Sequence, residues 1–578
     1  MELCEKAIQA VVHPTAAFQT DDDANVQPST ACQPDLWDTS LLNPKNRIDS
    51  LALPERPLWR IDGCTALGMQ YYAVPLFFRD VPPLRVDVFI YESQPSNLRQ
   101  QLELNVAFHT KDATRLSHLA ITKYIVRILE TWTRTKFPHL DACTDYYKNA
   151  PFGTRLVIEN LSTNIHNIEV QVARNHDLER RLLSLPNLEA LWGSNFDFPP
   201  IVDFHELQVI RVLHDSVCLV QYQGQQFIFK ALIGGNKYLY HELKTLCSLE
   251  PHPHVIAKPI HLVKKACNFG GKKAIIGFTT FYHCNGSLRD LLPQLRIHGE
   301  LDRPQQFKWS IQLTEALENL RVTTGTYYPD LRLDNIVLSA AMDLVMVDFE
   351  QRGVWCEFAA PEVNSLEYLR IIAMDDHVDM RFPTPDQENY HQKYQEILRR
   401  LVPDYDKLES DRYANPPDGY NIAWIALTPT EQEAAEVYML GRVLWCIFEG
   451  VSGPQKAAVW QSYPYESDLE FPDYDRTPLE LRDLIDRCTS GRRQTLGSSI
   501  ARQGGQLILR GVPLSQQGPK DVQDFARLFW KKELKVAEDY LAMRDEEMDK
   551  GKWTGNYYNR PTLKQVLDEL EKYQEILL

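Results

Sequence analysis

Apolar and polar residues follow three different patterns in successive parts of the chain. Over residues 1–40 large apolar residues are scarce among Asp, Pro, Ser, Thr and Gln, a composition that predicts disorder. From 41 to 198 apolar residues return at regular spacing, which predicts an accessory domain with both helices and strands. From 199 to 578 short apolar runs come first and long helical patterns follow, so we expect a β-rich part and then a helical part.

Individual segments of the accessory region predict particular elements. The runs 71–78 and 84–91 are rich in Val, Ile, Tyr and Phe and are bounded by proline-rich turns, which predicts two strands. Leu, Ile, Val and Trp recur at helical spacing over 116–137, and a second helical pattern covers 176–193, with an interruption predicted at Pro186. No cluster of residues in this region suggests chemistry.

Two predicted elements of the later part carry charged residues at defined places. Apolar residues alternate on both sides of Gly224 and predict a hairpin whose second strand ends at Lys230. Leucines at helical spacing follow, and the helix that they predict carries Glu242. Nearer the C-terminus, the apolar stripe of residues 521–549 predicts a long helix that packs on a core.

Composition and charge narrow the class of protein. Apolar residues make up 44% of the 578 residues and charged residues 24%, as is usual for a soluble globular protein. The net charge of -16 and the lack of a dense Lys/Arg block argue against nucleic acid as a partner. Apolar runs are too short to cross a membrane, and the N-terminus does not have the charge pattern of a signal peptide. The 11 cysteines form no CxxC pair, so we expect reduced thiols in the cytoplasm or the nucleus.

Candidate chemistry lies in polar residues that follow predicted strands or lie in loops. Asp330, Arg332 and Asn335 belong to the segment YYPDLRLDNIVL, and Asp348 follows an apolar strand in LVMVDFE, thirteen residues after Asn335. Carboxylate and amide oxygens suit Mg²⁺, and Lys230 supplies a cation for phosphate. These residue types in this order are typical of a site for phosphoryl transfer.

Further motifs continue the same order along the chain. AAPEV contains Glu362, AEVYMLGRVLWCIFEG contains Glu436, and RPTLKQVLDELEK contains Arg560. Taken together, these motifs resemble those of the eukaryotic protein kinase-like superfamily, of which the chain would be a divergent member. FIFKAL resembles the VAIK strand, YYPDLRLDNIVL the HRDLKxxN loop, LVMVDFE the DFG motif and AAPEV the APE motif.

The resemblance implies a fold class and a set of boundaries. We expect a bilobal protein-kinase-like fold over 199–578, preceded by the accessory α+β domain. The β-rich N-lobe would cover about 199–284 and the helical C-lobe about 285–578. Two inserts, near 363–430 and 489–555, would interrupt the C-lobe. The implied cofactors are ATP and Mg²⁺.

By the same resemblance, four residues take catalytic or metal-binding roles. Asp330 would orient the acceptor hydroxyl and accept its proton, while Arg332 would stabilise charge on the phosphate. Asn335 and Asp348 would be the ligands of Mg²⁺. These four groups would lie together in the cleft between the two lobes.

Five further residues take nucleotide-binding or structural roles by the resemblance. Lys230 would contact the phosphates of ATP and pair with Glu242 on the following helix. Val217 would cover the base of the nucleotide. Glu362 and Arg560 would form a structural ion pair inside the helical lobe.

The sequence departs from the family pattern at several of these places. The segment VIRVLHDSVCLV contains none of the glycines that cradle phosphates, and Asp215 stands where the last of them is expected. Glu350 replaces the glycine of DFG, and Tyr328 and Pro329 replace the His and Arg of the catalytic loop. The short segment between Asp348 and Glu362 contains no Ser, Thr or Tyr, so it offers no acceptor for an activating phosphate.

These observations leave three functions open. The first is an ATP-dependent protein kinase, specific for Ser or Thr, that transfers the γ-phosphate to a protein hydroxyl. The second is a pseudokinase that acts as a binding, scaffold or regulatory protein, which the missing glycines and Glu350 favour. The third is a small-molecule kinase, which the AAPEV segment and Arg560 disfavour. A protein substrate or partner, rather than nucleic acid or a membrane, is expected in the first two cases.

Overall fold

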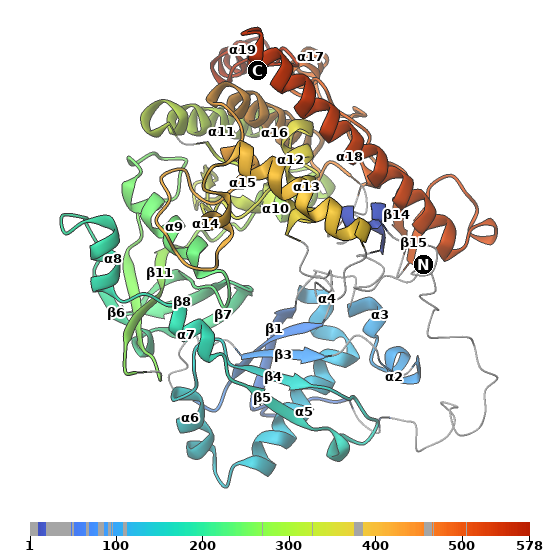
Figure 1. The fold of residues 1–578 in the computed structure, drawn as a ribbon. Coiled ribbons are helices and arrows are strands. Elements are labelled where there is room, and N and C mark those ends of the chain that lie inside the picture. Colours follow the sequence, from blue (N-terminus) through green and yellow to red (C-terminus); the bar gives the residue numbers. More distant parts are fainter. Residues whose placement is uncertain are drawn as a thin grey trace.

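Helices predominate in the protein, and its strands form several separate sheets. The computed structural model describes residues 10–18, 48, 51–64, 69–78, 86–90, 94, 96–107, 113–268, 270–325, 327–374, 385–455, 465, 467–503 and 506–577. Figure 1 shows the helical part above and two sheets below it. The prediction of mixed helices and strands is therefore confirmed at this coarse level.

The N-terminal region is built on a five-stranded sheet in the order β1-β2-β3-β4-β5. Its strands are β1 (Trp59–Cys64), β2 (Gln70–Pro75), β3 (Val86–Ile90), β4 (Arg155–Ile158) and β5 (Val170–Ala173). The pairs are antiparallel except β3 with β4, because the chain crosses between these two strands through helices. These helices are α2 (Ser96–Gln101), α3 (Leu104–Ala107), α4 (Ala113–His118), α5 (Ala120–Lys136) and α6 (Leu140–Lys148).

Most predicted elements of this region form near the expected places. β2 and β3 lie in the two runs predicted as strands, of which residues 84, 85 and 91 are outside the described part. The second helical pattern is broken at 182–184, between α7 (His176–Arg181) and α8 (Leu185–Trp192), and not at Pro186. Pro186 lies in the first turn of α8, where a missing N–H removes no helical hydrogen bond.

A six-stranded sheet follows in the order β6-β10-β11-β9-β8-β7. Its strands are β6 (Ile201–Asp203), β7 (Gln208–His214), β8 (Val217–Tyr222), β9 (Gln225–Lys230), β10 (His261–Ala266) and β11 (Lys273–Phe281). β8 and β9 form the hairpin predicted around Gly224, which has a positive φ of 82° at the turn. The helix predicted to carry Glu242 is α9 (Asn236–Ser248).

The two faces of the six-stranded sheet belong to two different hydrophobic cores. Val220 and Ile276 pack in one cluster with Trp59, Tyr124 and other residues of the N-terminal region. Neighbouring positions on the opposite face, such as Ile275, pack in a second cluster with α9 and the helical part. The five-stranded sheet and one face of the six-stranded sheet therefore share a single core.

Polar contacts reinforce this junction at the edge strand β7. The Asp62 carboxylate accepts a hydrogen bond from Val212 N at 2.8 Å, and Arg60 donates to Ile210 O at 2.8 Å. Both contacts tie β1 to backbone groups of β7 that have no neighbouring strand on that side. The edge of the six-stranded sheet is thus covered by the N-terminal region.

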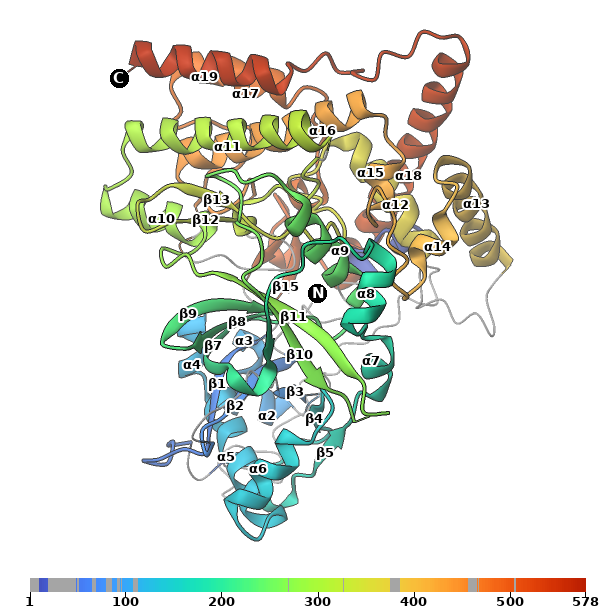
Figure 2. The same cartoon turned by 90° about the vertical axis from the view of Figure 1, so that its left-hand side faces the viewer.

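The helical part contains a buried central helix with others around it, as Figure 2 shows for the layers of α11, α16 and α19. Almost every residue of α16 from Glu431 to Glu449 is buried, which is typical of a helix packed on all sides. The helices are α10 (Leu288–His298), α11 (Arg303–Thr324), α12 (Pro361–Ala373), α13 (Pro385–Leu401), α14 (Tyr405–Glu409), α15 (Ile422–Ile425), α16 (Pro429–Glu449), α17 (Leu479–Cys488), α18 (Pro519–Asp549) and α19 (Leu563–Leu577).

Two small hairpins complete the helical part. β12 (Ile336–Leu338) pairs with β13 (Leu344–Met346), and β14 (Ile500–Gln503) pairs with β15 (Gln506–Leu509). The residue ranges of the two predicted inserts contain most of α12 together with α13, α14 and α15, and β14, β15 and α18. The long helix predicted over 521–549 is confirmed as α18.

The disorder predicted for residues 1–40 does not extend over residues 10–18. Residues Pro14–Phe18 form the 3₁₀ helix η1, in which Ala16 and Ala17 are fully buried against α18. Trp530 of α18 donates a hydrogen bond from Nε1 to Val11 O at 2.8 Å. The composition of residues 1–40 gave no signal for this contact, because Val11, a few alanines and backbone groups within one short segment make it. Residues 1–9 and 19–40 lie outside the described part of the chain.

Within the described residues, no helix combines the length and apolar character needed to cross a membrane. The cysteines described by the structure are free thiols, and most of them are buried. Burial in apolar surroundings raises the pKa of Cys143 and Cys247 to about 12, so these thiols stay protonated near neutral pH.

Candidate functional site

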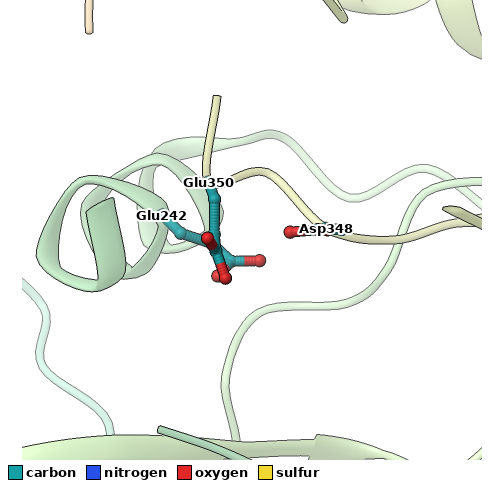
Figure 3. Close-up of side chains that lie close together, drawn as sticks. All are labelled: Glu242, Asp348 and Glu350. Atoms are coloured by element: carbon teal, nitrogen blue, oxygen red, sulfur yellow. The ribbon is translucent and has the colours of Figure 1, made fainter. Parts of the chain in front are cut away.

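The site is centred on the ammonium group of Lys230. Its Nζ lies 2.7 Å from Glu242 Oε2, 2.7 Å from Asp348 Oδ1 and 3.0 Å from Glu350 Oε1. Figure 3 shows the carboxylates of Glu242 and Glu350 side by side, with the Asp348 carboxylate facing them. Three acidic groups from two parts of the chain therefore meet at one buried lysine.

Local structure explains how these side chains meet. Lys230 is the last residue of β9 and lies opposite Phe278 of β11, and α9 begins only six residues later. Glu242 lies in the middle of α9, and its Oε1 accepts a hydrogen bond from Phe349 N at 2.9 Å. Asp348 follows the end of β13 with a φ of 67°, a left-handed conformation that turns the chain after the strand.

The charges at Lys230 determine one another's protonation. Burial disfavours the charged lysine, but Asp348, Glu242 and Glu350 outweigh this effect and raise its pKa well above the usual value. Burial would also raise the pKa of Asp348, yet the ammonium of Lys230 holds it below the usual range. Glu242 is the least exposed of the acids, and burial raises its pKa to about 8 despite the lysine. Lys230 and Asp348 thus form the charged centre of the site at neutral pH.

The same three carboxylates have the spacing of a metal site. One oxygen from each of Glu242, Asp348 and Glu350 lies within 4.8 Å of the other two. The ammonium of Lys230 lies among these oxygens and is the cation that they surround in this structure. A metal ion at the same point would compete with Lys230.

The catalytic-loop candidates form a second group that adjoins the first. Asn335 Nδ2 donates hydrogen bonds to Asp330 O and to Asp330 Oδ2, both at 3.0 Å. Arg332 Nε lies 3.3 Å from Asp330 Oδ2, and its guanidinium lies 5.0 Å from the ring centroid of Trp355. Burial raises the pKa of Asp330 to about 7, although Arg332 opposes this shift. The Asp348 charge acts on both Asp330 and Arg332, so the two groups share one electrostatic environment.

Tyr328, which precedes Asp330 in the same loop, links the two groups. Its hydroxyl donates to Asp348 O at 3.1 Å and also to Val347 O, and its ring packs edge-on against Phe349. Its backbone N–H donates to Glu436 Oε1 of α16 at 2.7 Å. Tyr328 therefore connects the Asp348 segment to the loop of Asp330 and to the buried helix α16.

The strand that precedes the site ends in a tight turn. In the ladder between β7 and β8, His214 lies opposite Val217, so Asp215 and Ser216 alone form the turn. Val217 lies opposite Lys230 in the β8–β9 ladder, and it is partly buried. The negative charge of Asp215 acts on Arg352, beyond Glu350. The turn between β7 and β8 thus carries the acidic side chain of Asp215 at the position where the sequence resemblance predicts glycines that bind phosphate through their backbone N–H groups.

Glu362 and Arg560 also meet, as the sequence analysis expected. Arg560 Nη1 lies 2.5 Å from Glu362 Oε1, and Nη2 lies 3.1 Å from Glu362 Oε2. Arg560 Nη1 also donates to Ala434 O of α16 at 2.9 Å, and both side chains are buried. This bidentate pair ties α12 to α16 and to the chain before α19.

The contacts of two residues of the site, Glu350 and Tyr328, were not predicted from the sequence. Glu350 was noted as a lost glycine, but its bond to Lys230 and its pair with Arg352 at 2.9 Å were not anticipated. The role of Tyr328 as a link was also missed. A signal for Glu350 existed, since an acid two residues after Asp348 returns to the same neighbourhood when the backbone turns at Asp348.

Comparison with known proteins gives no identity for the chain. No protein-family model matches it, and no curated protein matches it.

Proposed function

We propose that the chain is a protein-kinase-like phosphotransferase that uses ATP and Mg²⁺ to phosphorylate a protein hydroxyl. The observation that carries this proposal is the 2.7 Å contact of Lys230 with both Glu242 and Asp348. These residues come from a strand, a helix and a post-strand loop, and their meeting is what the family resemblance requires. A surface lysine without a role would not be buried among three acids.

The proposal includes a bilobal kinase-like fold. The six-stranded sheet with α9 would form the small lobe, and the helices from α10 onward would form the large lobe. Support comes from the position of the site, which joins β9 and α9 to the loops around β12 and β13. A further support is the pair of Glu362 and Arg560, which the resemblance had assigned to the large lobe.

The donor atoms of the site suit Mg²⁺ in their chemistry. Asp330, Asp348, Glu242 and Glu350 bring four carboxyl groups, against the cations of Lys230 and two arginines, Arg332 and Arg352. Carboxylate and amide oxygens are the ligands that Mg²⁺ prefers, and Asp348 keeps its negative charge beside Lys230. Asn335 uses its Nδ2 in its bonds to Asp330, so its amide oxygen is the atom suited to a metal. Asn335 and Asp348 would therefore hold the ion.

In the proposed reaction each residue has a defined task. Bound Mg²⁺ would neutralise charge on the phosphates of ATP. Asp330 orients the acceptor hydroxyl and takes its proton, and Asn335 and Arg332 fix the direction of its carboxylate. Lys230 binds phosphate oxygens with the ammonium that Glu242 holds in place.

The proposal is tested by binding and transfer measurements on matched variants. Calorimetry with ATP and Mg²⁺ should show binding to the protein and its loss in Lys230→Met and in Asp348→Asn. Lys407→Met is the control, because Lys407 is exposed on α14 and pairs only locally with Asp404. Transfer of labelled γ-phosphate to protein acceptors should disappear in Asp330→Asn. Equal behaviour of the protein and all four variants would refute the proposal.

One observation favours a second candidate, a kinase-like protein that binds partners without catalysis. One oxygen of Glu350 lies 3.0 Å from the Lys230 ammonium, and the other lies 2.9 Å from Arg352 Nη2. Phosphate oxygens would have to displace this acid to reach the ammonium. Absence of Mg²⁺-ATP binding, both in the protein and after Glu350 is replaced, would decide for this second candidate.

A further inference from the structure

One face of α9 is held by the chain segment 405–421, which lies within the first predicted insert. Figure 1 shows the chain after α14 passing beside α9. The segment contributes backbone carbonyls and aromatic rings, while α9 contributes two lysines, two tyrosines and a histidine. α9 carries Glu242, so whatever holds this helix also sets the position of the acid beside Lys230.

Lys237 makes the central contact of this interface. Its Nζ donates to Leu408 O at 2.6 Å and to Ser410 O at 3.0 Å, and only 4% of the residue is exposed. The rings of Tyr238 and Tyr420 lie 5.1 and 5.2 Å from the ammonium. A buried ammonium that donates to two carbonyls fixes two chain segments relative to each other, because loss of either carbonyl leaves a buried N–H without its acceptor.

Other contacts extend the interface along α9. Lys244 Nζ donates to Asn415 Oδ1 at 2.7 Å, one and a half to two turns beyond Lys237. The ring of Tyr240 lies 5.6 Å from that of Tyr413, which also accepts a hydrogen bond from Trp192 of α8 at 2.8 Å. The segment therefore holds α9 over most of its length.

The interface also reaches the loop of Asp348. His241 Nε2 lies 3.0 Å from Oε1 of Gln351, three residues after Asp348. Gly419 approaches both side chains so closely that a Cβ there would lie 2.7 Å from the Gln351 oxygen and 2.8 Å from the His241 nitrogen. Gly419 also has a φ of 79°, which glycine adopts without strain. The segment, α9 and the Asp348 loop thus form one packed unit.

We propose that Lys237 is a positioning residue, which together with segment 405–421 holds α9 so that Glu242 stays against Lys230. Its part in catalysis rests on the proposed function, whereas its hold on α9 does not. The short segment between Asp348 and Glu362 contains no hydroxyl that could be phosphorylated, so it cannot position α9 through a phosphate. The contacts of segment 405–421 do this without modification.

The test measures the helix directly and the nucleotide separately. Hydrogen exchange of the α9 amides is compared in the protein, in Lys237→Met and in Lys407→Met, at a temperature where all three are folded. Loss of hydrogen bonds from a charged donor should speed exchange in α9 about tenfold or more in Lys237→Met. Lys407→Met, the same substitution at an exposed position of the same segment, should leave α9 unchanged.

Calorimetry with Mg²⁺-ATP on the same proteins gives the second readout. Lys237→Met should weaken binding about tenfold, because Glu242 no longer holds the Lys230 ammonium in place. A Lys237→Met protein with unchanged α9 exchange overturns the positioning role. Should that variant fail to fold, Lys244→Met, which removes only the bond to Asn415, decides by the same two criteria.

The two proposals fail in different ways. If the unaltered protein does not bind Mg²⁺-ATP, the phosphotransferase is overturned, and the exchange measurement still decides whether Lys237 holds α9. If the protein binds Mg²⁺-ATP and Lys237→Met binds equally well, only the link from α9 to the nucleotide is overturned.

Discussion

At the scale of single residues, Lys230 is the group on which the site depends. Its ammonium has three acidic neighbours, and one of them, Glu350, stands at the glycine position of the DFG motif that the segment LVMVDFE resembles. The Glu350 carboxylate stabilises the buried ammonium of Lys230 and at the same time blocks one side of it from other anions. Lys230, Glu242 and Asp348 were singled out by their resemblance to kinase motifs, and the periodic pattern placed the first two at a strand end and on a helix. The contact of Glu350 could not, because it depends on the backbone turn at Asp348.

Replacing Glu350 should strengthen nucleotide binding. In Glu350→Gln the amide no longer neutralises Lys230, so phosphate oxygens meet a cation with one competitor fewer. A hydrogen-bonded charge pair of this kind corresponds to about a tenfold change in affinity or more. Calorimetry with Mg²⁺-ATP on Glu350→Gln and on Glu350→Asp, which keeps the charge, measures the effect. Weaker binding in Glu350→Gln than in Glu350→Asp would contradict this explanation.

Glu436 should make the stability of the protein depend on pH. The side chain is fully buried in α16, and burial raises its pKa to about 8 although Tyr328 N donates to it. An acid with a raised pKa in the folded state binds its proton there more tightly than in the unfolded chain. Stability is therefore highest below pH 4.5 as far as this group is concerned, and it falls as pH rises towards about 8.

The variant Glu436→Gln should remove this contribution. Its unfolding free energy should lose a slope of up to about 1.4 kcal/mol per pH unit between the two pKa values. Denaturant unfolding at pH 5, 6.5 and 8 is the measurement, with Glu546→Gln, a fully exposed acid on α18, as the control. An unchanged slope in Glu436→Gln would show that the group is ionised in the folded protein.

At the scale of elements, buried ion pairs near helix ends connect the helices of the helical part. Arg560 joins the chain before α19 to α12 and α16, and Arg544 of α18 pairs with Glu431 at the start of α16. The elements themselves were predictable wherever a long periodic pattern exists, as for α18 and α9. Short elements such as η1 were not, since alanines packed on another helix leave no pattern within five residues.

Removing one partner of the buried pair should destabilise the protein strongly. Arg560→Met leaves Glu362 buried without its cation, which costs about 3–5 kcal/mol in known cases. Arg487→Met is the matched control, because Arg487 pairs with Glu569 at 2.6 Å at a partly exposed site and should cost about 1 kcal/mol or less. Thermal unfolding of both variants checks the difference. Equal effects would mean that the buried pair has no special weight.

At the scale of the whole molecule, the N-terminal region and the six-stranded sheet form one folding unit. Their shared core contains Trp59 and Tyr124 from one side and Val220 and Phe229 from the other. The sequence predicted a domain boundary near residue 198, because short apolar runs typical of strands begin there. The apolar pattern predicts which residues of a strand are buried, but it does not predict which part of the chain covers each face. Both faces of the six-stranded sheet are buried, and the residues that cover them are distant in the sequence.

A chain that begins at residue 199 should therefore not fold stably. Its six-stranded sheet would expose one apolar face to water, at a cost of about 25 cal/mol for each Å². A chain of residues 51–578 keeps the shared core and should unfold cooperatively. Circular dichroism during heating, with a dye that binds exposed apolar surface, compares the two. Cooperative unfolding of the shorter chain at the same temperature would show that the two sheets are independent.

The shared core also affects how motion at the site would be transmitted. If the six-stranded sheet rotates relative to the helices, the five-stranded sheet should rotate with it. The two sheets share the core of Trp59 and Val220, and Asp62 and Arg60 of β1 form hydrogen bonds to β7. In such a rotation α6, which lies at the far end of the N-terminal region (Figure 1), would move over a longer distance than the residues around Lys230. If the site closes around a ligand, the displacement at the opposite end of the molecule should therefore be the larger one, and a fluorescent label at an exposed position there would measure it.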